Sequence, residues 1–166
     1  MSSRISEVVL DRTRQLVREA HGKKEYRPVA VAIIENQHGK LLFVQSAKNK
    51  ALWYLPQGGI EEKEDVVRAL FREVREELGI PKNCLTLVSY RGMKDLDAEK
   101  RRSDKRGFTR GKRYFFFRLK LKKPPAIVLR TTELSDYSWI CYSSLPDVLT
   151  PMRKERAEMT AEMIFK

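Results

Sequence analysis

The chain has 166 residues, of which 42% are hydrophobic, and it carries a formal net charge of +12. This length and composition suit one globular domain with one core. No apolar run is long enough for a membrane span, and the first residues lack the apolar stretch of a secretory signal. A polyanionic partner would explain the charge surplus. Cys84 and Cys141 sit in apolar, strand-like surroundings without metal or disulfide spacing, so we expect reduced, buried thiols in a cytoplasmic protein.

An N-terminal helix is the first predicted element, since Ile5, Val9 and Leu16 recur at helical spacing. We treat residues 1–25 as a helical extension and residues 26–166 as the main domain. The apolar patterns then predict, in chain order, strands over 27–35 and 41–46, a helix over 63–78 that Gly79 ends, strands over 85–92, 113–121 and 137–142, and a helix from about Lys154. Strands interleaved with helices at both ends predict an α/β fold, in which a mixed sheet is covered on two faces.

The helix over 63–78 carries three glutamates, Glu73, Glu76 and Glu77, on one arc beside its apolar stripe. Glu73 and Glu77 have no basic residue three or four positions away, and they repel each other at that spacing. Only Glu76 has such a partner, in Arg72. A divalent cation would relieve this repulsion, and oxygen ligands favour Mg²⁺ or Mn²⁺, which share their shell with substrate phosphates. The alternative is an ordinary solvated helix.

Residues 58–80 place this helix in a longer pattern, G-x5-E-x7-R-E-U-x-E-E-x-G-U, where U is a bulky apolar residue. Its fixed positions are Gly58, Glu64, Arg72, Glu73, Val74, Glu76, Glu77, Gly79 and Ile80. The pattern resembles the Nudix box at every fixed position. The resemblance implies a Nudix-type α/β/α sandwich over residues 26–166 and a metal-dependent hydrolase of nucleoside diphosphates that are linked to another group.

The same resemblance implies roles for individual residues. It assigns the metal site to Gly58, Glu73, Glu76 and Glu77, and it makes Arg72, together with Glu64, a residue that orients the loop and the helix. Bound Mg²⁺ would neutralise a pyrophosphate and lower the pKa of a water that attacks one phosphorus. A glutamate of the metal site, or one on a nearby loop, would take the proton of that water.

Similarity continues outside the box, over roughly Tyr26 to Lys154. Segments such as YRPVAVAII, WYLPQGGI and TELSDYSWICYSSLP resemble those of bacterial RNA pyrophosphohydrolases and diadenosine polyphosphate hydrolases. The resemblance implies that Arg27 stacks on 5′-terminal bases, that Glu133 is a further metal ligand or the general base, and that Arg153 or Lys154 supports RNA. The alternatives are an exposed arginine at a strand entry and a solvated loop glutamate.

Residues 91–113 form a basic segment with ten Lys or Arg against four Asp or Glu. It is either a solvated loop or a surface for a chain of phosphates. Arg110, Lys112 and Arg113 are the expected substrate contacts in it, and Arg101, Arg102, Lys105 and Arg106 lie near its centre. Phe108 and Tyr114 would either stack on a base or belong to the core.

These observations predict a Mg²⁺-dependent pyrophosphohydrolase whose preferred substrate is the 5′-triphosphate or 5′-diphosphate end of RNA. Two alternatives stay open. One is a dinucleoside polyphosphate hydrolase, such as one acting on diadenosine tetraphosphate. The other is a Nudix-fold RNA-binding module without turnover, against which the intact glutamate set argues. No membrane partner is expected, and the oligomeric state is left open.

Overall fold

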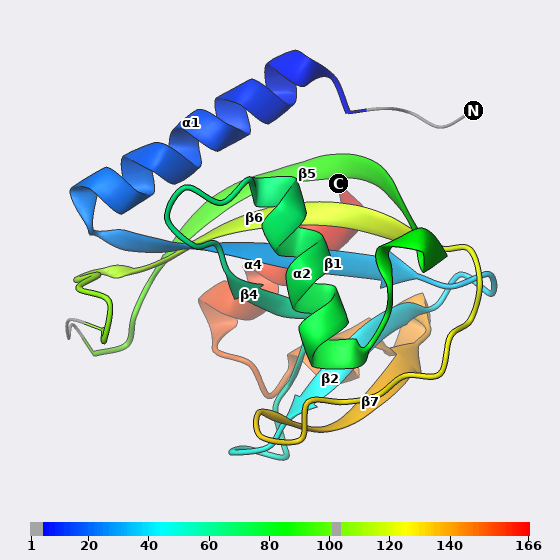
Figure 1. Cartoon of the computed structure of the whole chain (residues 1–166). Coiled ribbons are helices and arrows are strands. Elements are labelled where there is room, and N and C mark those ends of the chain that lie inside the picture. The colour runs from blue at the N-terminus through cyan, green and yellow to red at the C-terminus, as the bar shows by residue number, and fades with distance from the viewer. Residues whose placement is uncertain (1–4, 101–103) are drawn as a thin grey trace.

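The computed structural model describes residues 5–100 and 104–166, and it consists of a mixed sheet between two layers of helices (Figure 1). The helices are α1 (Glu7–Lys23), α2 (Val66–Leu78), α3 (Leu145–Leu149) and α4 (Lys154–Phe165), with 3-10 turns at Lys82–Cys84 and Tyr142–Ser144. The strands are β1 (Tyr26–Glu35), β2 (Leu41–Ser46), β3 (Trp53–Tyr54), β4 (Gln57–Gly59), β5 (Leu85–Asp97), β6 (Gly111–Leu121) and β7 (Leu134–Ile140). Within the described residues, no helix is both long and apolar enough to cross a membrane.

Strand β1 lies at the centre of the sheet, whose order is β3-β2-β1-β6-β5, with β7 beside β2. It runs parallel to β6 and antiparallel to β2 and to the short β4. The prediction of a mixed sheet is therefore confirmed. Strands β3 and β4 were not predicted, because two or three residues are too few to show an alternating pattern.

Alternation along β1 explains why the sheet is covered on both faces. Side chains of a strand point to opposite faces in turn. Ala30 and Ala32 belong to the core under α1 and α2, whereas Val31 and Ile33 belong to the core under α3 and α4. All four are at most 2% exposed, which is why the strand reads as a continuous apolar run rather than an alternating one. The predicted α/β/α sandwich is confirmed.

Helix α1 forms as predicted, but its buried face differs from the one read from the sequence. Leu10, Thr13, Val17 and Ala20 face the core, while Val9 is 37% exposed. Thr13 fits this buried position because its hydroxyl donates to the Val9 carbonyl oxygen at 2.8 Å. A polar residue that bonds to its own helix can thus occupy a core position that an apolar pattern does not reveal.

The basic segment 91–113 is in large part strand, because β5 continues to Asp97 and β6 begins at Gly111. Arg91 bonds to the carbonyl oxygens of Met163 and Ile164 in α4 rather than facing a loop. Arg101 and Arg102 lie outside the described residues.

Three further expectations are settled by burial. Phe108 and Tyr114 are 3% and 5% exposed, so they belong to the core and the base-stacking alternative for them is wrong. Cys84 is buried as expected, but Cys141 is exposed. Cys141 comes directly after the end of β7, where the chain leaves the sheet, so its apolar neighbours in the sequence do not cover its side chain.

Candidate active site

Strand β4 and helix α2 bring the residues of the glutamate-rich pattern together, joined by the loop 60–65. The helix begins at Val66 instead of the predicted Lys63. Asp65 is its N-cap, with a side chain that accepts from the backbone N–H groups of Val67 and Arg68. Lys63 has a φ of 66°, which an α-helix does not contain. Gly79 ends the helix in the left-handed conformation, as expected.

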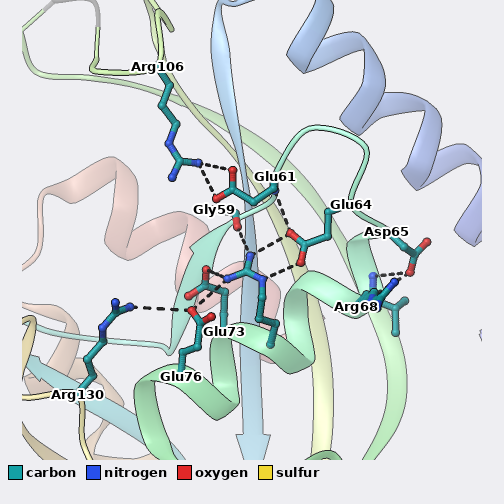
Figure 2. Close-up of polar contacts among 11 residues, drawn as sticks. Gly59, Glu61, Glu64, Asp65, Arg68, Glu73, Glu76, Arg106 and Arg130 are labelled. Atoms are coloured by element: carbon teal, nitrogen blue, oxygen red, sulfur yellow. Dashed lines mark hydrogen bonds and ion pairs between the residues drawn. The ribbon is translucent and has the colours of Figure 1, made fainter.

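Arg72 is the centre of a network that ties the loop to the helix (Figure 2). Its Nε and Nη2 donate to Glu64 at 2.7 and 3.0 Å, and Nη2 also donates to the carbonyl oxygen of Gly59 at 2.9 Å. Its Nη1 donates to Glu73 at 2.7 Å and to Glu76 at 3.1 Å. The hydrogen bond to Glu64 is the main reason why the pKa of Arg72 is raised. One guanidinium therefore fixes both the loop and two carboxylates of the helix.

Glu77 is the most buried carboxylate of the site, at 3% exposure. Burial raises its pKa to about 8, and the negative charges of Glu73 and Glu133 act in the same direction. The backbone N–H of Gln57 donates to Glu77 Oε2 at 3.2 Å and opposes the shift. Burial likewise raises the pKa of Glu73, against its hydrogen bond from Arg72. Burial and mutual repulsion thus both disfavour the charged forms of these carboxylates, as expected where too few cations balance them.

Gly58 leaves room for one of these carboxylates. A Cβ atom at this position would collide with the carboxyl group of Glu73. The pairing of Gly58 with Ala30 of β1 fixes the backbone there, so the strand could not move aside. A glycine at this position is thus needed for Glu73 to lie against β4.

A segment far along the chain completes the site. The backbone N–H groups of Val128 and Arg130 donate to the carbonyl oxygens of Leu78 and Glu77, both at 2.9 Å, and so satisfy open acceptors at the end of α2. The Glu133 carbonyl oxygen accepts from Ala47, after β2, at 2.9 Å. These bonds place the Arg130 guanidinium 3.9 Å from Glu76 and 4.0 Å from Glu133.

Together these elements line a polar cavity of about 560 Å³. The predicted residues that it brings together are Arg27, Gly58, Arg72, Glu73, Glu76, Glu77, Lys112 and Glu133. Lys112 also lines a neighbouring cavity of about 340 Å³ with Arg153 and Arg156.

Other predicted substrate contacts lie elsewhere. Arg113 bonds to Asp95 of the neighbouring strand β5 and to the Leu16 carbonyl oxygen of α1. Arg110 lies over the ring of Tyr26. Lys154 is 83% exposed and lines neither cavity. We therefore leave Arg110, Arg113 and Lys154 out of the substrate contacts considered below.

Sequence reasoning missed Glu61 and Arg130, which also line the cavity, as does Arg106, which it had placed only within the basic segment. None of them occupies a fixed position of the box, and Arg106 and Arg130 reach the cavity from segments without regular structure. The one available signal is that Arg130 stands three residues before Glu133.

The donor chemistry of the site fits a divalent cation. Glu73, Glu76, Glu77 and Glu133 offer hard carboxylate oxygens around one cavity. Among the residues that the structure describes, no three such groups already converge on one point, because Arg72 holds Glu73 and Glu76 while Arg130 faces Glu133. A bound ion would draw these carboxylates away from the two guanidiniums and toward itself.

Comparison with known proteins agrees with the resemblance of the pattern over residues 58–80. Residues 25–163 match the family model described as NUDIX domain. An RNA pyrophosphohydrolase of Marinomonas sp. (strain MWYL1) is 32% identical over 124 residues, covering 70% of this chain and 76% of that protein. An RNA pyrophosphohydrolase of a Nitratiruptor species is 33% identical over 129 residues, covering 74% and 83%.

Solved structures show the same fold. A dihydroneopterin triphosphate pyrophosphohydrolase of E. coli superposes with a TM-score of 0.65 at 24% identity, covering 83% of this chain and 95% of that one. An Ap4A hydrolase of C. elegans, in a binary complex, superposes with a TM-score of 0.59 at 22% identity, covering 81% and 92%.

Proposed function

The chain belongs to the NUDIX family, and from this premise we propose that it is a Mg²⁺-dependent pyrophosphohydrolase acting on the 5′-triphosphate or 5′-diphosphate end of RNA. As a Nudix hydrolase it opens phosphoanhydride bonds, and hydrolases of this family generally use divalent metal ions. The observation that carries the proposal is the cavity in which five glutamates lie among Arg and Lys side chains. Such a cavity suits a polyphosphate bound together with cations.

Glu73, Glu76, Glu77 and Glu133, with the Gly58 backbone beside them, would hold the metal. When bound, Mg²⁺ would offset the charge of the diphosphate and lower the pKa of the attacking water. Arg72 keeps Glu73 and Glu76 oriented from the side of the loop. Glu77 is held by the Gln57 backbone N–H and lies buried at the cavity wall.

Glu133 is the residue we propose as proton acceptor. Its side chain is 58% exposed, and its ion-pair partner within the described chain is Arg130 at 4.0 Å. A carboxylate on a loop at the cavity wall can take the proton of a water that attacks phosphorus. The product would be a 5′-monophosphate end and pyrophosphate or phosphate.

Two features support RNA as the substrate. The RNA pyrophosphohydrolases above are at least 32% identical over about three quarters of their length. The second cavity, lined by Lys112, Arg153 and Arg156, adjoins the first. These basic side chains would contact the phosphates of the following nucleotides. An RNA substrate would place the enzyme in the cytoplasm, where an exposed thiol such as Cys141 stays reduced.

A side-by-side turnover assay with Mg²⁺ tests the proposal. We expect kcat/KM for a 5′-triphosphorylated RNA oligonucleotide to exceed that for diadenosine tetraphosphate and for free nucleoside triphosphates by about tenfold or more, which is about 1.4 kcal/mol at the transition state. A lead for the dinucleotide would make the chain a dinucleoside polyphosphate hydrolase. RNA binding without turnover of any substrate would make it a binding module.

A further inference from the structure

Arg106 reaches the rim of the catalytic cavity from a segment remote in sequence. Its Nη1 donates to both carboxylate oxygens of Glu61, at 2.8 and 2.9 Å. Glu61 belongs to the loop between β4 and α2 that Arg72 holds from the other side (Figure 2). Both residues line the cavity, and neither has a role in the function proposed above.

The turn that carries Arg106 is well defined by hydrogen bonds. The side chain of Asp104 accepts from the backbone N–H groups of Arg106 and Phe108 at 2.8 and 3.0 Å. Gly107, with a φ of 87°, donates to the Asp104 carbonyl oxygen at 3.0 Å. Aspartate and glycine are the residues that such a tight turn requires.

This turn is also anchored to the body of the protein. Phe108 is 3% exposed, with the ring of His21 against it in an edge-on arrangement and the Lys24 ammonium 4.6 Å from its centroid. The backbone N–H groups of Thr109 and Arg110 donate to the carbonyl oxygens of residues 24 and 25 at 3.0 and 2.8 Å. Arg106 therefore projects from a fixed base rather than from a free loop.

The guanidinium of Arg106 has donors to spare. Arg72 uses its N–H groups on four protein partners, whereas Arg106 Nε and Nη2 have no protein partner within the described residues. Figure 2 shows Arg106 and Arg130 on opposite sides of the carboxylates that Arg72 gathers. A polyphosphate bound at those carboxylates would thus meet Arg106 at one end.

We propose that Arg106 is a substrate-binding residue that exchanges Glu61 for a phosphate oxygen of the bound polyphosphate. The inference rests on the proposed function of this cavity. Glu61 and Arg106 are 53% and 46% exposed in their side chains, and ion pairs this exposed contribute little to stability. A guanidinium bonded to phosphate through two parallel N–H groups makes a stronger, charge-assisted contact. Glu61 holds the guanidinium at the rim until the substrate arrives.

The first experiment measures the affinity for inorganic tripolyphosphate by calorimetry in the presence of Mg²⁺. We expect Arg106→Ala to weaken binding about tenfold, since one bidentate phosphate contact is lost. Glu61→Gln should tighten binding about threefold, because the competitor for the guanidinium is gone. The matched control is Arg12→Ala, which removes the same charge from an exposed position on α1 that lines neither cavity and should stay within about twofold of the unchanged chain.

The two substitutions are expected to change the affinity for tripolyphosphate in opposite directions, and this difference tests the proposal. If Arg106→Ala and Glu61→Gln weaken binding equally, the pair merely pins the turn to the loop and the proposal fails. It also fails if Arg106→Ala matches Arg12→Ala, or if the unchanged chain does not bind tripolyphosphate.

RNA turnover separates this inference from the proposed function. With 5′-triphosphorylated RNA we expect Arg106→Ala to raise KM about tenfold and to leave kcat within about threefold. Arg106→Lys should recover part of the loss, because it keeps the charge but not the two parallel N–H donors of the guanidinium. An enzyme that turns over no RNA would refute the proposed substrate, while the tripolyphosphate affinities would still decide the role of Arg106. A loss in kcat instead of KM would overturn the assignment of Arg106 as a binding residue.

Discussion

At the scale of single residues, Glu77 combines two opposing demands. Its carboxylate is buried at the end of the cavity, where burial opposes the charge that a metal ligand must carry. Glu77→Gln keeps the shape and an oxygen that can accept from the Gln57 N–H. We expect kcat to fall about 100-fold or more, because a ligand is lost from the transition state.

The same substitution should have a different effect on stability. Without Mg²⁺, Glu77→Gln should unfold about 2 °C or more above the unchanged chain, since burial disfavours the ionisation of Glu77 and the amide does not ionise. Added Mg²⁺ should raise the unfolding temperature of the unchanged chain and raise that of the variant much less. Calorimetry with and without Mg²⁺ checks both. Glu62→Gln, an exposed change outside the cavity, is the control, and a variant with near-normal turnover would remove Glu77 from the metal site.

The glutamates of α2 and Arg72 could be predicted from the sequence, because they lie on one helix and the helical period determines how they are spaced. Glu73 and Glu77 could be singled out from the absence of cations within helical reach. Arg72 nevertheless bonds to its neighbour Glu73, and a second cation, Arg130 beside Glu76, comes from a distant segment. Contacts of that kind depend on the hydrogen bonds that hold residues 128–130 against α2, and no local pattern encodes them.

At the scale of elements, α1 supports the start of α2. Arg14 Nε donates to Asp65 Oδ1 at 2.6 Å, while the other oxygen of Asp65 caps α2. Burial would raise the pKa of Asp65, but its hydrogen bonds, with Arg14 the strongest among them, lower it instead. The carboxylate is thus more favourable in the folded chain than in the unfolded one.

Substitutions at Asp65 test this support. Asp65→Ala should lower the free energy of unfolding by about 0.5–2 kcal/mol through loss of the cap, and Asp65→Asn should cost less because an amide oxygen still caps. The deficit of Asp65→Asn should be present at pH 7 and disappear as the pH falls below the ordinary value of 3.8 and through the lowered pKa of the folded state. Urea unfolding across this range measures it. A deficit that does not change with pH would show that the charge of Asp65 does not contribute.

The cap also explains an error of the sequence reading. Apolar periodicity located α2, and Gly79 gave its end, but the start was placed at Lys63 instead of Val66. Lys63 is held in a left-handed turn next to Glu64, whose carboxylate bonds to Arg72 in the second turn of the helix. The boundary is set by that contact across the loop, so periodicity alone could not give it.

At the scale of the whole molecule, the surplus of +12 is distributed differently from what the basic segment suggested. Arg91 and Arg113 of that segment are bonded to α4 and to β5 and α1, and they stabilise the fold rather than a ligand. The exposed lysines at 100 and 105, outside both cavities, are the described part of the segment that remains free to meet further phosphates of a chain.

Salt dependence tests whether these lysines do so. For a long 5′-triphosphorylated RNA, log kcat/KM should fall with log salt between about 50 and 200 mM, with a slope of about −0.7 for each phosphate contacted. Replacing Lys100 and Lys105 by alanine together should flatten that slope by about 1.4, because two phosphate contacts are lost. Tripolyphosphate binding should stay unchanged, because the short anion does not extend beyond the cavity. The matched control replaces Lys122 and Lys123, which are exposed after the end of β6. Equal flattening in both double variants would mean that the surplus acts only as a diffuse field, and that Lys100 and Lys105 form no specific path for RNA.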